Sequence, residues 1–168
     1  MTESNNKILN ILADKISFIL GGSSDMASSC RVNLSKEANF TSKNYLGRNI
    51  TFGVREAAMG SIVSGISTYG FQTFAATHLR YAYSMLEDIK MNSLMNLPVC
   101  YIFTHDGFSN SKKGAVESSF EVLNVLRNIP HVLVFRPSDI NEIIGVWGPI
   151  LKAKQTTCLI LSGEITHI

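Results

Sequence analysis

The sequence predicts an α/β protein in which a mostly parallel sheet of six strands lies between two layers of helices. Two observations predict this fold. Short runs rich in Val, Ile and Leu alternate along the chain with stretches in which apolar residues recur at helical intervals. Some of these runs, such as residues 99–104, are hydrophobic at nearly every position, which is typical of strands that a parallel sheet buries on both faces.

The first half of the chain is expected to alternate helices and strands. Its first strand is expected to stop at Gly21 and Gly22, because a glycine pair interrupts regular structure. Gly60 and Gly65 lie in a helical stretch, where we expect them to let a neighbouring backbone approach closely. In chain order the expected elements are a helix over 6–15, strands over 16–20 and 50–52, a helix over 54–68, a strand over 71–77 and a long amphipathic helix over 79–95.

The second half continues the alternation around a polar stretch at residues 106–114. Ser138 or Asp139 can cap the last helix, which runs to Lys154. No internal repeat, low-complexity tract or linker interrupts the pattern, so residues 1–168 are expected to form a single domain. The remaining expected elements are strands over 99–104, 131–135 and 157–161 and a helix over 117–127.

Composition excludes several classes of protein. Apolar residues make up 45% of the chain, the net charge is +2, and the basic residues are scattered, unlike those of a nucleic-acid binder. Cys30, Cys100 and Cys158 have neither disulfide-framework nor zinc-site spacing, so we expect reduced, packed thiols. A signal-peptide core and a run of about 20 apolar residues are both missing. We therefore expect a cytoplasmic protein that binds neither nucleic acid nor membrane.

Polar residues follow the predicted strands where a ligand site is expected. In parallel α/β sheets, ligands bind outside the carboxyl ends of the strands. Asp25, Glu56, His78 and His105 lie just after predicted strands or at the start of the following helix. The phosphate-loop, dinucleotide, serine-hydrolase and zinc-protease motifs do not occur, so those functions lack support.

Five blocks of sequence stand out in chain order. They are residues 21–25 (GGSSD), 52–60 (FGVREAAMG), 101–106 (YIFTHD), 129–137 (IPHVLVFRP) and 159–162 (LILS). In this order they resemble the central pyrimidine-binding domain of transketolases, and the similarity covers almost the whole chain. The Thr-His-Asp strand end favours transketolases over the related deoxyxylulose-phosphate synthases. The resemblance implies the thiamine diphosphate-binding fold and a transferase of the pentose phosphate pathway.

The resemblance assigns Glu56 to a catalytic, cofactor-binding role beside the pyrimidine nitrogen of thiamine diphosphate, with Asp25, His78 and Tyr81 also binding the cofactor. The family's three aromatic positions fall on His78, Tyr81 and Ser84, of which only Tyr81 is a conventional stacking residue. From the residues alone, alternatives stay open. Glu56 and the preceding arginine could form a solvated ion pair, Asp25 could cap a helix, and Tyr81 could be a core residue on an ordinary helix face.

The resemblance also assigns a substrate side to the domain. Ser29 and His105 align with a serine and a histidine that bind the substrate phosphate, and His105 is assigned a catalytic role as well. The family's two phosphate-binding arginines fall on Thr2 and Gly163, so both positive charges are missing.

The loop after the fourth strand departs further from the family. Lys113 stands where an aspartate reads a substrate hydroxyl, and Glu117 stands where a catalytic histidine is expected. A carboxylate of ordinary pKa, about 4.3, has no proton to donate at neutral pH. Lys112 and Lys113 could recover some affinity for anions, but a solvated loop explains them as well.

Two hypotheses follow from the resemblance. In the first, the chain is the pyrimidine-side portion of a thiamine diphosphate-dependent ketol transferase for sugar phosphates, with a partner chain supplying the diphosphate-binding domain and its Mg or Ca. Stand-alone activity is not expected, because the chain lacks the Gly-Asp-Gly and Asn metal-site motif. In the alternative, it is a catalytically degenerate homologue with a regulatory or structural role. A fragment of a longer protein and a homodimer both stay open.

Overall fold

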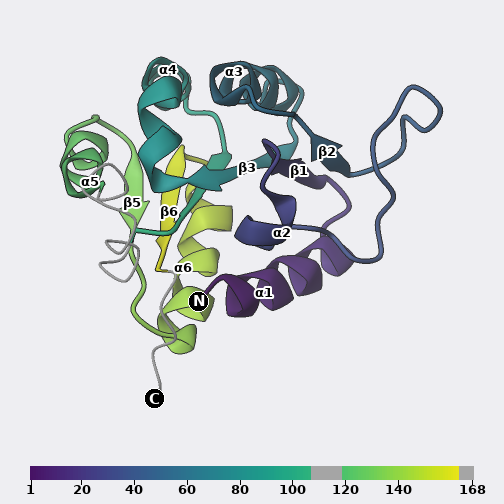
Figure 1. Cartoon of the computed structure of the whole chain (residues 1–168), viewed down its shortest axis with the longest axis horizontal. Helices are drawn as coiled ribbons and strands as arrows, with labels where there is room; N and C mark the ends of the chain where they lie inside the picture. The colour runs from purple at the N-terminus through teal and green to yellow at the C-terminus, as the bar shows by residue number, and fades with distance from the viewer. Residues whose placement is uncertain (107–118, 163–168) are drawn as a thin grey trace.

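The structure, a computed structural model, describes residues 1–106 and 119–162 (Figure 1). Its strands form one six-stranded sheet in the order β2-β1-β3-β4-β6-β5, and each neighbouring pair is parallel. The predicted α/β fold class is therefore confirmed. The strands are β1 (Ile19–Ser23), β2 (Asn49–Thr51), β3 (Gln72–His78), β4 (Val99–Thr104), β5 (Leu133–Phe135) and β6 (Thr157–Leu161).

Helices cover both faces of the sheet, giving the predicted three layers (Figure 1). One face packs under α1 (Thr2–Lys15), α2 (Ala27–Cys30) and α6 (Ile140–Ala153). The other packs under α3 (Glu56–Ser67), the 3-10 helix η1 (Leu79–Met85), α4 (Leu86–Leu94) and α5 (Phe120–Arg127). The helices of each layer share an apolar core with the facing side of the sheet.

Strand β4 shows how the sequence specifies these two cores. All six of its residues are buried, and successive side chains point to opposite faces, as strand geometry requires. Cys100 and Ile102 join the core under α1 and α6, whereas Val99, Tyr101 and Phe103 join the core under α3 and α4. Because both faces of β4 are covered by helices, its sequence is apolar at nearly every position.

Strand β1 corrects the prediction that Gly21 and Gly22 stop the strand. Both residues lie inside β1, which ends at Ser23. A Cβ atom on Gly21 would lie 2.0 Å from the Phe74 carbonyl oxygen of β3, and one on Gly22 would lie 1.8 Å from the Ile50 carbonyl oxygen of β2. The glycines are needed because the two neighbouring backbones approach β1 closely.

The helical glycines give a mixed result. A Cβ on Gly60 would lie 2.6 Å from Asp88 Oδ2, so the close neighbour of Gly60 is a side chain of α4 and not the expected backbone. Nothing lies within 4 Å of that position on Gly65, so the prediction for Gly65 is wrong.

Helix boundaries differ from the predictions where local sequence signals are weak. The first helix begins at Thr2 and not at residue 6, and the long helix predicted over 79–95 is divided into η1 and α4. The short α2 was not predicted. Asp139 caps α6 by accepting a 2.8 Å hydrogen bond from the Glu142 backbone N–H, which decides between the two expected caps.

We predict that Gly21→Ala lowers the free energy of unfolding by about 2–3 kcal/mol, because the added methyl group must displace the backbone of β3. Urea denaturation followed by far-ultraviolet circular dichroism measures this change. The matched control is Gly145→Ala in α6, where a Cβ meets no atom within 4 Å. There alanine should stabilise the helix by about 0.5–1 kcal/mol. Equal effects of the two substitutions would contradict the close approach of β1 and β3.

Candidate functional site

The carboxyl ends of three adjacent strands lie together at one edge of the sheet. Ser23 at the end of β1 is in register with Ala76 of β3, and His78 at the end of β3 is in register with Thr104 at the end of β4. Asp25 and His105 follow β1 and β4 within two residues. The residues predicted to follow strands are therefore close to one another in the fold.

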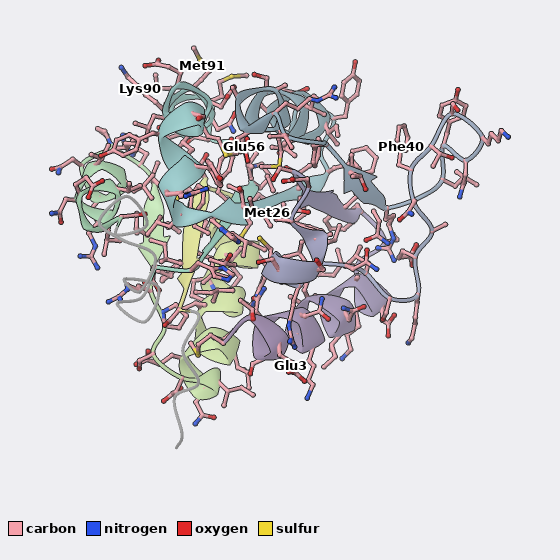
Figure 2. All side chains as sticks on the ribbon, viewed as in Figure 1. Glu3, Met26, Phe40, Glu56, Lys90 and Met91 are labelled. Atoms are coloured by element: carbon pink, nitrogen blue, oxygen red, sulfur yellow. The ribbon has the colours of Figure 1, made fainter. Side chains whose placement is uncertain are left out.

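Glu56 is the first residue of α3, and its side chain is buried, with the residue 9% exposed. Its Oε1 accepts a 3.3 Å hydrogen bond from Thr77 Oγ1, on the penultimate residue of β3. A buried carboxylate needs such a donor, and the amino end of a helix favours negative charge. Figure 2 labels Glu56 between α3 and α4, on the sheet side of α3.

The alternative of a solvated ion pair between Glu56 and its neighbour is not seen. Arg55 is exposed, its guanidinium lies against Gly53, and within the described part of the chain it forms no ion pair with Glu56. Among the described residues the hydrogen bond from Thr77 is the one side-chain bond of the Glu56 carboxylate. Its Oε2 can therefore pair with a ligand nitrogen.

Ser29, His78 and His105, which we call the histidine cluster, come from α2, the end of β3 and the residue after β4. Ser29 Oγ lies 2.9 Å from His78 Nε2, and the two imidazole rings have centroids 4.0 Å apart at an interplanar angle of 32°. His105 has φ of +61° and places its Nδ1 2.9 Å from Thr104 Oγ1. All three cluster residues are half-buried.

Tyr81 on η1 continues this row of rings. Its ring stacks on that of His78, with centroids 6.4 Å apart at 28°. The Arg80 guanidinium lies over the Tyr81 ring, 4.4 Å from the centroid, and donates a hydrogen bond to the Tyr81 hydroxyl. Ser84, the third of the aligned aromatic positions, is exposed. The cation beside Tyr81 was not anticipated from the sequence.

Asp25 does not cap a helix, although its sequence context allowed that alternative. The residue before α2 is Met26, which forms no side-chain cap hydrogen bond. Asp25 is exposed, and its Oδ1 accepts a 3.5 Å hydrogen bond from the neighbouring Ser24 Oγ. Its carboxylate is therefore turned to the surface at the carboxyl edge of β1.

The buried side chains of Cys30 and Thr104 pack against the histidine cluster. Cys30 Sγ lies 3.4 Å from Thr104 Oγ1, the same hydroxyl that contacts His105. Burial raises the pKa of the Cys30 thiol to about 11. The hydrogen bond with Thr104 lowers this pKa, and the negative charge of Asp25 raises it further, but both effects are smaller than that of burial. Cys30, like Cys100 and Cys158, is a free, buried thiol, as predicted.

The residue after His105 ties this edge to β5. Asp106 Oδ2 accepts a 2.5 Å hydrogen bond from Arg136 Nε, and the Asp106 side chain is buried. Its Oδ1 has no partner within the part of the chain that the structure describes. Sequence reasoning used the Thr-His-Asp block only as a family signal, yet Asp106 helps to fix the backbone that carries His105.

Several residues singled out from the sequence cannot be placed in this site. Lys112, Lys113, Glu117 and Gly163 lie outside the described residues. Thr2 is the first residue of α1 and is half-buried. The position where the resemblance expects the first phosphate-binding arginine therefore carries an uncharged threonine.

A groove of about 640 Å³ lies away from the histidine cluster, between the loop before β2 and helix α3. It includes Arg55 but not Glu56. No three His, Cys, Asp or Glu side chains in the described ranges could hold a metal ion together. Nor does any helix there have the length and apolarity needed to cross a membrane.

Comparisons with known proteins agree with one another. A family model for the transketolase pyrimidine-binding domain matches residues 1–165. The transketolases of Halalkalibacterium halodurans and Bacillus subtilis are 39% and 35% identical over 163 residues, which cover 96% of this chain and 24% of each relative. The chain thus spans about a quarter of the length of these curated relatives.

Solved structures give the same similarity. The transketolase of Campylobacter jejuni superposes with a TM-score of 0.91 at 33% identity, over 97% of this chain and 25% of that one. A split-gene transketolase, in an inactive β4 tetramer, superposes with a TM-score of 0.78 over 99% of this chain and 52% of its own. At 23% identity, the latter likeness shows the fold alone.

We predict that none of the three thiols reacts readily with Ellman's reagent in the folded chain. At pH 8 a thiol whose pKa is about 11 is thiolate in about one molecule in a thousand, and burial further restricts access to Cys30. The control is the same chain in urea, where three thiols should react at once. Rapid reaction of one thiol before unfolding would contradict the packing of Cys30 under the cluster.

Proposed function

The chain belongs to the transketolase family, matching its pyrimidine-binding domain, and we propose that it is the pyrimidine-side portion of a thiamine diphosphate-dependent ketol transferase acting on sugar phosphates. We propose that residues 1–168 form this one domain. The single observation that carries the proposal is the buried Glu56 carboxylate, which Thr77 holds at the carboxyl edge of the sheet.

The donor set around Glu56 fits an aminopyrimidine. The Thr77 hydroxyl occupies Oε1, and Oε2 is left to share a proton with a ring nitrogen. Burial of the carboxyl strengthens that contact by excluding water. When bound, thiamine diphosphate supplies the carbon nucleophile that protein side chains lack. Glu56 would then hold the proton at the pyrimidine, and its fixed position at the start of α3 would orient that ring.

Other residues at the same edge would complete the pyrimidine side. We propose Tyr81 as an aromatic wall, backed by the Arg80 cation, with His78 beside it. Asp25, exposed after β1, would approach the cofactor from the interface with a partner. Ser29 and His105 would contact the substrate phosphate, and His105 would also take part in the reaction.

A partner would supply the diphosphate side. The chain spans about a quarter of its curated relatives, so a full transketolase contains much that this chain does not. A protein that shares the fold is a split-gene transketolase, which supports a division of the enzyme between chains. We propose that a diphosphate-binding domain or subunit holds the Mg or Ca and the diphosphate. A homodimer of this chain would join two pyrimidine sides.

A catalytically degenerate homologue with a regulatory or structural role remains the second candidate. It is favoured by Thr2, which puts an uncharged side chain at a position where the family has a phosphate-binding arginine. The hydrogen bond between Ser29 Oγ and His78 Nε2 also favours this candidate, because it competes with a phosphate for the Ser29 hydroxyl.

Glu56→Gln separates the two candidates. The glutamine keeps an oxygen for the Thr77 hydroxyl but cannot hold the proton, so ketol transfer from xylulose 5-phosphate should fall by at least about a hundredfold. The assay mixes the chain with a diphosphate-binding transketolase domain, thiamine diphosphate and Mg²⁺, and it follows both activity and the heat of cofactor binding.

Glu87→Gln is the matched control, because Glu87 is an exposed residue of α4 and should leave activity unchanged. Absence of cofactor uptake in every combination would remove the enzyme proposal and favour the degenerate homologue. Full activity of Glu56→Gln would contradict the assigned role of Glu56.

A further inference from the structure

The groove beside β2 has the features of a protein docking surface. It lies between the loop formed by residues 35–48 and helix α3, and its volume is about 640 Å³. We propose that this groove binds an amphipathic helix of the diphosphate-binding partner, a helix that presents an apolar stripe and one carboxylate. The identity of that partner rests on the proposed function, whereas the shape and the charge of the groove do not.

Exposed apolar side chains border the groove on both sides. On the loop, Leu46 is 90% exposed and Tyr45 is 72% exposed, and on α3 Ile62 is exposed as well. The ring of Phe40, which Figure 2 labels on this loop, packs edge-on against Tyr45 with centroids 5.8 Å apart. Gathered apolar side chains of this kind mark interaction sites, whereas single exposed ones do not. The groove therefore favours an apolar surface over water as its occupant.

The loop holds its exposed side chains in fixed positions. At its base, the Arg48 guanidinium donates hydrogen bonds to the Glu37 carboxylate and to backbone carbonyl oxygens within residues 13–19. At its tip, Thr41 and Asn44 exchange two backbone hydrogen bonds of 2.9 and 3.0 Å. A loop that is already ordered loses little conformational entropy when a partner binds.

Pairing at the edge of the sheet indicates that the occupant is a helix. Strand β2 lies at the edge, where an extended peptide could add as a further strand. In this chain the Asn49 N–H donates to the Ala38 carbonyl oxygen, and the Asn49 carbonyl oxygen accepts from the Phe40 N–H. The loop thus already pairs with the first residue of β2. An amphipathic helix needs no such backbone bonds, because it fills a groove with the side chains of its apolar face.

The charge of the groove selects an acidic helix. None of the described residues that line it is Asp or Glu, and its two cations are Arg48 and Arg55. Glu37 pairs with Arg48 at 2.6 Å, whereas Arg55 is exposed and has no ion pair with any other residue that the structure describes. A carboxylate on the helix would pair with Arg55. A symmetric dimer through this face would instead bring two Arg55 side chains into one interface, where like charges repel.

The position of the groove suits the diphosphate-binding partner. One end of the groove lies at Arg55, the residue before Glu56, and it extends from there to Phe71, just before β3. A partner that brings a cofactor to Glu56 therefore reaches the groove as well. The chain spans 24% of its curated relatives from Halalkalibacterium halodurans and Bacillus subtilis, so the rest of such a protein is long enough to include this helix.

Titration calorimetry of the whole 168-residue chain with a diphosphate-binding transketolase domain tests this surface. The titration is made without and then with thiamine diphosphate and Mg²⁺, so that effects on the neighbouring Glu56 are seen separately. Leu46→Ser removes an exposed apolar side chain and Arg55→Glu reverses a charge, and each should weaken binding of the domain by about tenfold or more. Arg55→Lys keeps the charge and should weaken binding less.

Matched controls change the same kinds of side chain on the other face of the sheet. Ile144→Ser and Lys152→Glu alter exposed residues of α6, and both should leave binding unchanged. Thermal melts by circular dichroism establish that each variant is folded. Sedimentation velocity of the chain alone examines the other occupant, a second copy. Self-association that Leu46→Ser abolishes would assign the groove to that copy and overturn the proposal.

The outcomes separate this proposal from the proposed function. Domain binding that Leu46→Ser and Arg55→Glu leave unchanged would overturn the docking surface, and cofactor uptake by the same mixture would leave the proposed function intact. Domain binding that both variants lose, without cofactor uptake by the unsubstituted chain, would support the docking surface and count against the proposed function. Absence of domain binding by the unsubstituted chain would overturn the docking surface together with the proposed partner.

Discussion

The alternation of side chains along β3 organises the candidate site. Thr77 and His78 are consecutive, so they point to opposite faces of the sheet. Thr77 donates to Glu56 on α3, in the helix layer of one face, and His78 contacts Ser29 on α2, in the layer of the other. The carboxyl edge is thereby divided into an acidic half and a half with two imidazoles. Neither half could move to the other face without shifting the register of β3 by one residue.

That register depends on small residues in β1. Gly21 and Gly22 let β1 lie between β2 and β3 with a backbone separation that no side chain would allow. The same packing sets the height of Ser23 beside Ala76, and so the position at which the chain turns into α2 with Ser29. Helix α3 follows β2 on the other side, which brings Glu56 over the end of β3. The site residues are thus placed by backbone contacts made several residues away.

The sequence was sufficient to predict the fold class because hydrophobic periodicity records burial directly. The strands at Val99–Thr104 and Thr157–Leu161 agree at both ends with the predicted ranges, since every residue in each is buried. Strand β1 was misplaced because a glycine pair signals a turn and a close backbone approach equally well. The 3-10 geometry of η1 was missed because its apolar spacing suits either helix type.

The site was predictable only in part. The positions of Glu56, His78 and His105 near strand ends follow from chain order in a parallel sheet. The burial of the Glu56 carboxylate against Thr77 and the contact of His78 with Ser29, 49 residues away, depend on tertiary packing that no local pattern records. Arg80 over Tyr81 could have been suspected from its place beside an aligned aromatic position, since arginine stacks on such rings.

The two halves of the edge remain mechanically joined even though their chemistry differs. Thr77 and His78 share one peptide unit at the end of β3, so a displacement of that end alters the Glu56 and Ser29 contacts together. A change in the contact between His78 and Ser29 therefore also reaches the Thr77 hydroxyl that holds the Glu56 carboxylate. Because strand ends are held by fewer neighbours than strand centres, this coupling would act where the sheet is easiest to shift.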